Sequence, residues 1–366
     1  MVNILFFIDT LSGGGAEKVL QNLVNHLDQT QFRITVHTLQ ECDPVPYLVP
    51  GIRYKAINCC KTALGRKLFS YWIRFCAEVG LLYPLYIRDD YDIEVAYLEC
   101  GPTKFLSRST NRSALKLAWV HCDFEKRNFR ATRKQKAIYA SYDKVVCVSD
   151  RVKESFLHLF GAPPAIVLHN VIDENEIMAK AGNPANPNKF TFLCVGRLSH
   201  EKGIDRLLDA CCRLKEDHLD FHLQILGDGP QRTKLESQIQ ALGLENQVSL
   251  LGFRDNPYPY MKAADCIVCA SRYEGFSTVV TEALILGKPV VTTPCSGMDE
   301  LLGDSEFGLI TEDSVDGIYL GMKRMLEDAE LKNHYAEAAA CRGRNFSKAA
   351  TVKATEQFLL AELSSK

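Results

Sequence analysis

Short apolar runs recur along the first half of the chain, and each is followed by a longer segment with helical periodicity. The first run, at 2–8, is apolar at nearly every position, as expected of a parallel strand with both faces covered. The segment after it has apolar residues three and four positions apart between residues 19 and 27. Further strands are predicted at 32–39, 93–98, 115–121, 144–149 and 166–170. This alternation predicts a doubly wound α/β domain with a parallel sheet.

The alternation begins again after a linker rich in proline and asparagine at 183–189. Strands are predicted at 190–196, 221–226, 247–253, 266–270 and 288–293, with helices from 316 onward and a terminal helix at 349–363. Because the same layout occurs in both halves, we expect two similar domains, at 1–180 and 187–345, that face one another across a cleft. No sequence repeat relates the two halves.

A glycine-rich turn at 12–15 joins the first strand to its helix. This layout presents main-chain N–H groups to a phosphate or a sugar. The turn is not a P-loop, because GxxxxGK[ST] is absent, and Lys18 stands where a dinucleotide fingerprint would continue with glycine. A tight turn that only packs the helix against the sheet is the alternative.

The stretch SRYEGFSTVVTEALIL at 271–286 begins as a loop and becomes a helix near Thr278. Glu274 lies in the loop, and Glu282 lies eight positions later in the first turns of the helix. A helix N-terminus offers unpaired N–H groups and a positive dipole end, which suit a phosphate. Carboxylates beside such a site accept hydrogen bonds from hydroxyls, so the stretch predicts a nucleotide-sugar site. An acid/base pair is the alternative for two carboxylates at this spacing.

Two cations and a histidine follow other predicted strands. Arg197 and Lys202 flank the loop RLSHEKG, which precedes a helix, and two cations beside a helix N-terminus are candidates to bind a diphosphate. His121 ends the strand in LAWVHCDF, at the edge where open α/β sheets bind ligands. Solvated surface charges and a structural histidine are the alternatives.

Size and charge narrow the functional class. A chain of 366 residues with 46% hydrophobic residues is long enough for two complete cores. The net charge of −2 gives no overall basic bias, so no nucleic-acid partner is expected. Residues 61–136, however, contain 15 lysines and arginines against 8 aspartates and glutamates. This surplus of basic residues predicts that the first half binds an anionic membrane or a phosphate-bearing acceptor. A basic face exposed to solvent is the alternative.

The segment at 67–88 has helical periodicity and is rich in aromatic and basic residues. Such a helix either lies on a membrane surface or packs into the first domain. The basic stretch EKRNFRATRKQK is expected to form a loop or helix near the site of His121.

The 14 cysteines lack the spacing of a disulfide framework, so we expect buried free thiols in a reducing cytosol. Cys266 and Cys269 form a CxxC, but they lie within an apolar strand and have no partner pair, which argues against a metal site. We expect no signal peptide, because the first residues lack a charged segment and the apolar run is too short, and no run reaches the length of a membrane span.

Several segments resemble a known family. VGRLSHEKGIDRLL, ILGDGP, SRYEGFSTVVTEALILGKPVV and SGMDELL, with GGGAEK, WVH and VLHNVID in the first half, are similar to the retaining glycosyltransferases of family 4. The resemblance spans nearly the whole chain and implies the GT-B fold, in which two Rossmann-like parallel-sheet domains face a deep cleft. It also implies a C-terminal helix at 346–366 that crosses back to the first domain. The overall pattern is similar to that of bacterial transferases that build capsule, O-antigen or other lipid-linked glycans.

The resemblance implies roles for individual residues. Arg197 and Lys202 would hold the donor diphosphate, Glu282 would bind the ribose hydroxyls, and Glu274 would contact hydroxyls of the donor sugar. His121 would lie beside the donor sugar. The other residues expected to bind substrate are Gly14, Gly15, Asn170, Gly229, Phe253, Arg254, Gly275, Phe276, Ser277 and Thr278.

The resemblance also implies the chemistry. The donor would be a nucleotide-diphosphate sugar, with uracil expected as the base, and neither a metal nor a cofactor is expected. Retention would proceed by attack from the leaving-group face through an oxocarbenium-like state, with the departing phosphate accepting the proton of the acceptor. Glu274 as a covalent nucleophile is the rival mechanism.

The expected acceptor is a polyprenyl-diphosphate-linked saccharide, bound by a cytoplasmic protein at the inner face of the cytoplasmic membrane. Two other functions are compatible with this fold: a UDP-sugar 2-epimerase and a non-catalytic nucleotide-sugar-binding protein. The RLSHEKG loop and the two glutamates eight residues apart favour the transferase.

Overall fold

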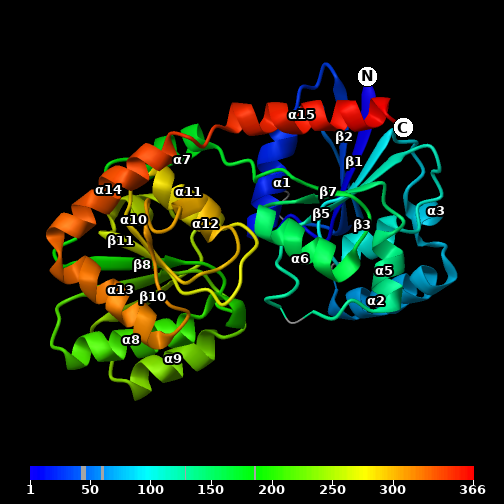
Figure 1. The fold of residues 1–366 in the computed structure, drawn as a ribbon. Coiled ribbons are helices and arrows are strands. Elements are labelled where there is room, and N and C mark those ends of the chain that lie inside the picture. Colours follow the sequence, from blue (N-terminus) through cyan, green and yellow to red (C-terminus); the bar gives the residue numbers. More distant parts are fainter. Residues whose placement is uncertain (43–46, 59–61, 128, 185–186) are drawn as a thin grey trace. The chain divides into compact units, whose positions relative to one another are not determined.

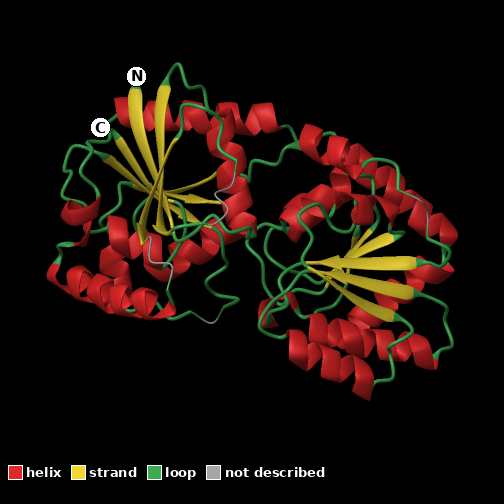
Figure 2. Ribbon diagram, turned by 180° about the vertical axis from the view of Figure 1, so that it is seen from behind, coloured by secondary structure: helices red, strands yellow, loops and turns green. Residues whose placement is uncertain are grey.

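The chain folds into two compact units, each built on a parallel sheet. The computed structural model describes residues 1–42, 47–58, 62–127, 129–184 and 187–366. One unit comprises Met1–Val171 with Ala349–Lys366, and the other comprises Ile172–Lys348. Helices flank both faces of each sheet (Figures 1 and 2). The prediction of two doubly wound α/β domains is therefore confirmed.

The sheet of the first unit has the strand order β3-β2-β1-β4-β5-β6-β7, and every neighbouring pair is parallel. Its central strand β1 is covered on both faces, since residues 4–8 are at most 1% exposed. Coverage on both faces explains why this strand is almost uninterruptedly apolar. The strands are β1 (Val2–Ile8), β2 (Phe32–Gln40), β3 (Arg53–Asn58), β4 (Ile93–Ala96), β5 (Leu115–Val120), β6 (Lys144–Cys147) and β7 (Ala165–Val167).

Seven helices described in the first unit connect or cover these strands. They are α1 (Gly15–His26), α2 (Ala63–Val79), α3 (Leu82–Tyr86), α4 (Gly101–Leu106), α5 (Arg133–Tyr139), α6 (Asp150–Phe160) and the C-terminal α15 (Lys348–Ser364). From Ala349 onward, α15 belongs to this unit (Figure 1). Its Glu356 carboxylate accepts the main-chain N–H of Asp28 at 2.7 Å, and Glu362 pairs with Lys144 at 2.5 Å.

The aromatic segment predicted to be helical at 67–88 forms two helices rather than one. α2 ends at Val79, and Gly80 takes the left-handed conformation (φ 76°) that terminates a helix without a Cβ penalty. The basic stretch after His121 remains irregular until α5, which begins after a capping box formed by Thr132 and Gln135. Residue 128 of that stretch lies outside the described residues.

The sheet of the second unit has the order β10-β9-β8-β11-β12-β13, again with every pair parallel. Its strands are β8 (Thr191–Val195), β9 (His222–Leu226), β10 (Val248–Gly252), β11 (Cys266–Cys269), β12 (Val290–Thr292) and β13 (Leu309–Ile310). Its helical elements are α7 (Glu174–Ala181), the 3₁₀ turn η1 (His200–Lys202), α8 (Ile204–Glu216), α9 (Arg232–Ala241), α10 (Tyr258–Ala263), α11 (Thr278–Ile285), α12 (Met298–Leu302), α13 (Val315–Glu327) and α14 (Ala329–Gly343). The helix α7 belongs to this second unit, which begins at Ile172.

Two edge strands were missed in the sequence, and several predicted strands are shorter than expected, among them those at 93–98, 144–149, 166–170 and 288–293. β3 lies at the edge of its sheet, and its first four residues alternate between exposed and half-buried positions, so it lacks a continuous apolar run. β13 has only two residues. The strand predicted at 166–170 ends at Val167, which leaves His169 and Asn170 in the following loop. The linker predicted at 183–189 lies partly outside the described residues, at 185–186.

The order of the strands reverses once in each sheet. In the first unit the chain moves outward from β1 to β2 and β3, then returns to build β4 on the other side of β1. In the second unit the reversal lies between β8 and β11. Helices leave toward opposite faces at such a point, which opens a crevice at the carboxyl ends of the two strands. Ligand-binding residues are therefore expected directly after β1, β4, β8 and β11.

The buried strands make a first prediction about stability. Leu193 on the central strand β8 is fully buried, so Leu193→Ala removes apolar contacts and leaves a cavity. We expect the free energy of unfolding of the second unit to fall by about 2–5 kcal/mol in denaturant titration. The matched control is Leu320→Ala on α13, where the side chain is 54% exposed, and there we expect a change within about 0.5 kcal/mol. Equal losses in the two variants would contradict the assignment of β8 to the core.

Candidate functional site

The reversal point of the second sheet brings together a predicted cation and a predicted carboxylate. Lys202 ends the turn η1 after β8, and Glu274 lies in the loop after β11. Lys202 Nζ donates to Glu274 Oε1 at 2.6 Å, with side-chain exposures of 25% and 13%. Because 72 residues separate them in sequence, only the adjacency of β8 and β11 makes this contact.

Lys202 is held in its charged form. Burial disfavours the ammonium of Lys202, but the neighbouring Glu274 carboxylate outweighs this effect, and the pKa of Lys202 is raised. Glu274 Oε1 also accepts the hydroxyl of Ser271 at 2.7 Å. One carboxylate oxygen therefore binds two donors within the protein, and the site presents a fixed cation beside a fixed anion.

The loop that carries Glu274 is anchored through the carbonyl oxygen of Ser271. That oxygen accepts hydrogen bonds from Arg206 Nη2 at 2.8 Å, Thr293 Oγ1 at 2.5 Å and Cys295 Sγ at 2.9 Å. The donors come from α8 and from the segment after β12, so the loop is tied to both sides of the sheet. Such anchoring fixes the direction of Glu274 before any ligand binds.

A second anchor joins the same loop to the beginning of α8. Arg272 binds Asp205 through two hydrogen bonds of 2.8 Å, and the Arg272 guanidinium lowers the pKa of the Asp205 carboxyl. Gly203, just before α8, has a left-handed backbone (φ 62°), and a Cβ there would lie 2.0 Å from the carbonyl oxygen of Ala270. Only glycine permits this approach of the two loops.

The GDGP loop after β9 packs against the loop that carries Arg197. The Leu198 N–H donates to the Asp228 carbonyl at 3.0 Å, and a Cβ on Gly229 would lie 2.6 Å from the Leu198 carbonyl oxygen. Gly229 therefore allows close contact between the two loops. Arg197 itself is exposed, and its guanidinium makes no ion pair within 4 Å in the described part of the chain.

The helix predicted near Thr278 is α11, which begins at that residue. Its N-cap is Ser277, whose side chain accepts the N–H of Val280 at 3.3 Å. Gly275 and Phe276 are buried beside this helix start. Glu282 lies in the second turn and accepts a hydrogen bond from the Tyr258 hydroxyl at 3.3 Å. Tyr258 has no signal in the sequence, because it reaches Glu282 from a different helix, α10.

Phe253 and Arg254 follow β10 and are both exposed. In the part of the chain that the structure describes, neither residue forms a hydrogen bond or ion pair with Lys202 or Glu274. The structure places them at the same edge of the sheet, two strands away from β8.

The predicted residues of the first unit also follow its strands. Gly14 and Gly15 begin α1 after β1, His121 follows β5, and Asn170 follows β7. Burial lowers the pKa of His121 to about 4, so its imidazole is neutral at physiological pH. Within the described residues, its Nε2 is buried and has no hydrogen-bond partner.

Two carboxylates that we did not predict lie at the reversal point of this first sheet. Asp9 follows β1, and burial together with Glu17 and Glu99 raises its pKa to about 6. Glu99 follows β4 and accepts the main-chain N–H of His121 at 3.1 Å. A carboxylate directly after each of the two strands predicted at 2–8 and 93–98 is the sequence signal that would have identified them.

Three further features concern metal ligands, cysteines and membrane-spanning helices. Among the described residues, no group of three or more histidine, cysteine or acidic side chains has a metal-binding arrangement, and the described cysteines are free thiols. The helices that the structure describes include none with the length and hydrophobicity of a membrane span. The predicted CxxC cysteines, Cys266 and Cys269, are both buried in β11.

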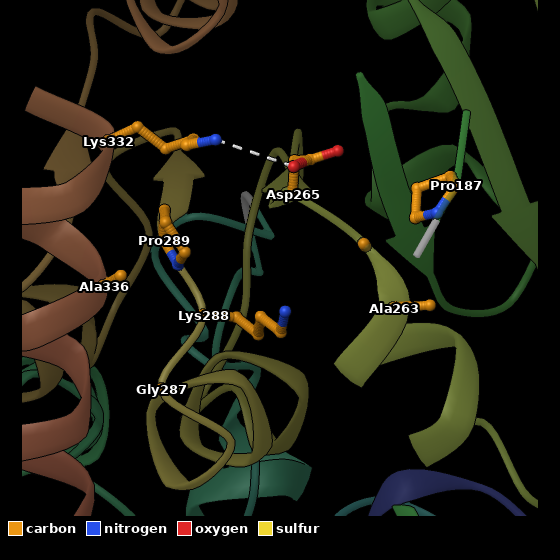
Figure 3. A pocket seen from close by; sticks show the side chains of 9 residues that line it. Pro187, Ala263, Asp265, Gly287, Lys288, Pro289, Lys332 and Ala336 are labelled. Carbon is orange, nitrogen blue, oxygen red and sulfur yellow. Dashed lines mark ion pairs between the residues drawn. The ribbon is translucent and has the colours of Figure 1, made fainter. Parts of the chain in front are cut away.

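A pocket of about 370 Å³ lies at the amino ends of β11 and β12, lined by Asp265, Lys288 and Lys332 among others (Figure 3). Lys332 Nζ lies 3.6 Å from Asp265 Oδ1. The Lys202–Glu274 pair lies at the carboxyl ends of the same sheet, and no predicted site residue lines the pocket. This pocket is therefore separate from the candidate site.

Comparisons with known proteins agree with this geometry. The model of the family "Glycosyl transferases group 1" matches residues 175–342, and that of "Glycosyltransferase Family 4" matches residues 13–176. The chain is 32% identical to an N-acetylgalactosamine-N,N'-diacetylbacillosaminyl-diphospho-undecaprenol 4-alpha-N-acetylgalactosaminyltransferase from Campylobacter jejuni, across 98% of this chain and 100% of that protein. It is 33% identical to the alpha-D-kanosaminyltransferase of Streptomyces kanamyceticus over 40% of this chain and 39% of that protein.

Solved structures share the fold at low sequence identity. Sucrose-phosphate synthase from Thermosynechococcus elongatus superposes with a TM-score of 0.80 at 19% identity, covering 100% of both chains. HepE from Anabaena, solved in complex with UDP-glucose, gives a TM-score of 0.75 at 21% identity, covering 99% of this chain and 100% of that one. Together with the full-length relative, these matches show that the chain belongs to family 4 of the glycosyltransferases and has the GT-B fold.

Proposed function

We propose that this glycosyltransferase moves a sugar from a UDP-sugar to a hydroxyl of a polyprenyl-diphosphate-linked saccharide, with retention of configuration and without a metal. The observation that carries the proposal is the Lys202–Glu274 pair at the carboxyl ends of β8 and β11, near the start of α11. A cation and a helix N-terminus suit a diphosphate, and an adjacent fixed carboxylate suits the hydroxyls of the attached sugar.

In this proposal the chain stabilises the leaving group. Cleavage of the sugar–phosphate bond places new negative charge on the nucleoside diphosphate. Lys202 is already charged and held in place, so its ammonium stabilises the negative charge on the leaving group without reorganisation of the site. Arg197 is exposed and makes no ion pair within 4 Å in the described chain, so its guanidinium is available to the diphosphate.

Glu274 would bind the donor sugar through its second oxygen. Oε1 already accepts hydrogen bonds from Lys202 and Ser271, which leaves Oε2 for a sugar hydroxyl. A carboxylate held by an ammonium and a hydroxyl is also a poorer nucleophile. This argues for attack by the acceptor from the leaving-group face, with its proton passing to the departing phosphate, rather than for a covalent Glu274 intermediate.

The proposed donor and acceptor are supported by relatives. HepE is described in complex with UDP and with UDP-glucose, and the name of the Campylobacter protein specifies a saccharide on diphospho-undecaprenol. We infer the same classes of substrate here, with the protein working at the inner face of the cytoplasmic membrane.

An exposed aromatic stripe on α2 supports contact with a membrane. Leu68, Tyr71, Trp72 and Phe75 are 47–61% exposed and are spaced three and four residues apart, so they share one face of the helix. Trp72 Nε1 donates to the hydroxyl of Tyr86 at 3.1 Å, which joins α2 to α3. Large apolar side chains in a basic region of sequence are typical of a helix that lies in the interface of an anionic bilayer.

The direct test is incubation of the protein with UDP-sugars, with and without the saccharide-diphospho-undecaprenol named for the Campylobacter relative. Sugar transfer only in the presence of the acceptor supports the proposal. Interconversion of UDP-sugars without acceptor would instead indicate a 2-epimerase, and binding without turnover a non-catalytic protein. Nuclear magnetic resonance of the product's anomeric proton determines whether configuration is retained.

Lys202→Ala removes the cation at the reversal point. With saturating donor, we expect kcat to fall by at least about a hundredfold, because charge on the leaving group is no longer stabilised. The matched control is Lys234→Ala on the exposed face of α9, which should keep wild-type turnover. Near-normal kcat in the Lys202 variant would refute the diphosphate assignment.

Glu282→Ala tests the ribose assignment. We expect weaker binding of UDP in isothermal titration calorimetry, by roughly tenfold, because one or two hydroxyls lose a charged hydrogen-bond acceptor. The control is Glu245→Ala, an exposed glutamate between α9 and β10. Unchanged UDP affinity in the Glu282 variant would count against the ribose role.

The aromatic stripe predicts binding to phospholipid vesicles. A triple variant with glutamine at Leu68, Trp72 and Phe75 should bind vesicles containing anionic phosphatidylglycerol at least about tenfold more weakly, because each buried apolar side chain contributes more than about 1 kcal/mol. Sedimentation with vesicles measures the partition. Leu320→Gln, equally exposed on α13, serves as the control. If the triple variant sediments with vesicles as wild type does, α2 is not the membrane contact.

A further inference from the structure

The pocket of about 370 Å³ at the amino ends of β11 and β12 has no part in the proposed sugar transfer (Figure 3). Its volume lies at the lower end of the range of roughly 300–1,000 Å³ that is typical of small-molecule sites. It is built entirely from the second unit, at the opposite ends of the strands from Lys202 and Glu274. Small residues form much of its wall, among them Ala263, Ala264, Gly287 and Ala336.

Lys288 lines this pocket as a half-buried cation. It follows α11 and precedes β12, and its main-chain N–H donates to the Ala283 carbonyl at 2.9 Å, which fixes its backbone at the end of the helix. Its side chain points into the pocket (Figure 3). Among the described residues, its ammonium makes no hydrogen bond and no ion pair within 4 Å.

The surroundings of Lys288 disfavour its charge. Burial lowers the pKa of its ammonium, Asp265 opposes this effect, and Lys262 and Lys332 add to it. Lys262 Nζ donates to the Gly182 carbonyl at 2.7 Å, an interaction that leaves its positive charge in place. Three lysines against one aspartate therefore leave an excess of two positive charges in and beside the pocket.

Asp265 offsets this charge only in part. Its Oδ2 accepts the main-chain N–H of Thr191 at 2.9 Å, and its Oδ1 lies 3.6 Å from Lys332 Nζ. The second distance is that of an ion pair but is too long for a hydrogen bond. Within the described chain, Lys332 Nζ donates no hydrogen bond, so two ammonium groups that line the same cavity both keep donors for a ligand.

Two such ammonium groups match an anion with several acceptor oxygens. A phosphate group carries a charge between about −1.5 and −2 and three strong acceptor oxygens, whereas a carboxylate carries one charge and two oxygens. We propose that this pocket binds a small molecule bearing a phosphate group, through Lys288 and Lys332. The small residues around them leave room for the rest of the molecule. This site is distinct from the diphosphate site assigned to Lys202 and does not depend on the proposed function.

Isothermal titration calorimetry with inorganic phosphate and with glycerol 3-phosphate tests the pocket. Lys288→Met keeps the length of the side chain and removes its charge, so we expect the Kd of both probes to rise at least about tenfold. Lys234→Met on the exposed face of α9 is the matched control and should bind as wild type does. The Lys202→Ala variant should still bind phosphate in this pocket. The probe with the lower Kd identifies either the free ion or a phosphate monoester as the ligand.

Asp265→Asn should change the affinity in the opposite direction. The amide oxygen can still accept the N–H of Thr191, but the negative charge beside Lys332 is lost. We expect phosphate to bind at least about threefold more tightly to this variant, because a repelling carboxylate has been removed.

Thermal melting separates loss of the site from loss of the fold. In buffer without phosphate, Lys288→Met should melt no lower than wild type, because the charged lysine lies in an unfavourable environment. Added phosphate should raise the Tm of wild type and of Lys202→Ala more than that of Lys288→Met. If Lys288→Met melts lower, the affinity of Asp265→Asn decides between the two causes. Unchanged phosphate affinity in both Lys288→Met and Asp265→Asn would overturn this inference, as would acetate binding to wild type as tightly as phosphate at equal ionic strength, or no binding of either phosphate probe.

Discussion

The reversal of strand order in each parallel sheet is the constraint on which the sites of this glycosyltransferase depend. Parallel strands bring all their carboxyl ends to one edge, and the reversal sends the neighbouring helices to opposite faces. In the second unit this geometry brings Lys202 and Glu274 to 2.6 Å across 72 residues of sequence. In the first unit it places Asp9 and Glu99 after adjacent strands.

Several loop contacts in the second unit fix the direction of one carboxylate, that of Glu274. Three donors converge on the carbonyl oxygen of Ser271, and Arg272 joins the same loop to Asp205. The hydroxyl of Ser271 then bonds Glu274 directly. A site whose charges are already oriented needs little reorganisation when charge develops in a reaction, and this is the physical basis of electrostatic catalysis.

The two units differ in how they satisfy their polar groups. Lys202 and Glu274 neutralise one another in the free protein, so that site is stable without a ligand. Asp9 has no such partner, and the Nε2 of His121 is buried without a donor in the described chain. Among its described residues, the first unit therefore carries polar groups that lower its local stability, in keeping with the general conflict between stability and function.

The sequence by itself determined the fold class, nearly all the buried strands, and the placement of Glu274 before a helix and of Glu282 within it. Apolar runs identify strands that are covered on both faces, and helix starts carry local signals such as Ser277 before α11. The edge strands β3 and β13 were not predicted, because a strand with one open side, or with only two residues, has no such apolar run. The partnerships of Lys202 with Glu274, of Tyr258 with Glu282 and of Glu99 with His121 were decided only by the tertiary structure. The local pattern of apolar and polar residues indicates whether a residue is buried, whereas the order of strands in the sheet decides which residues distant in sequence come into contact.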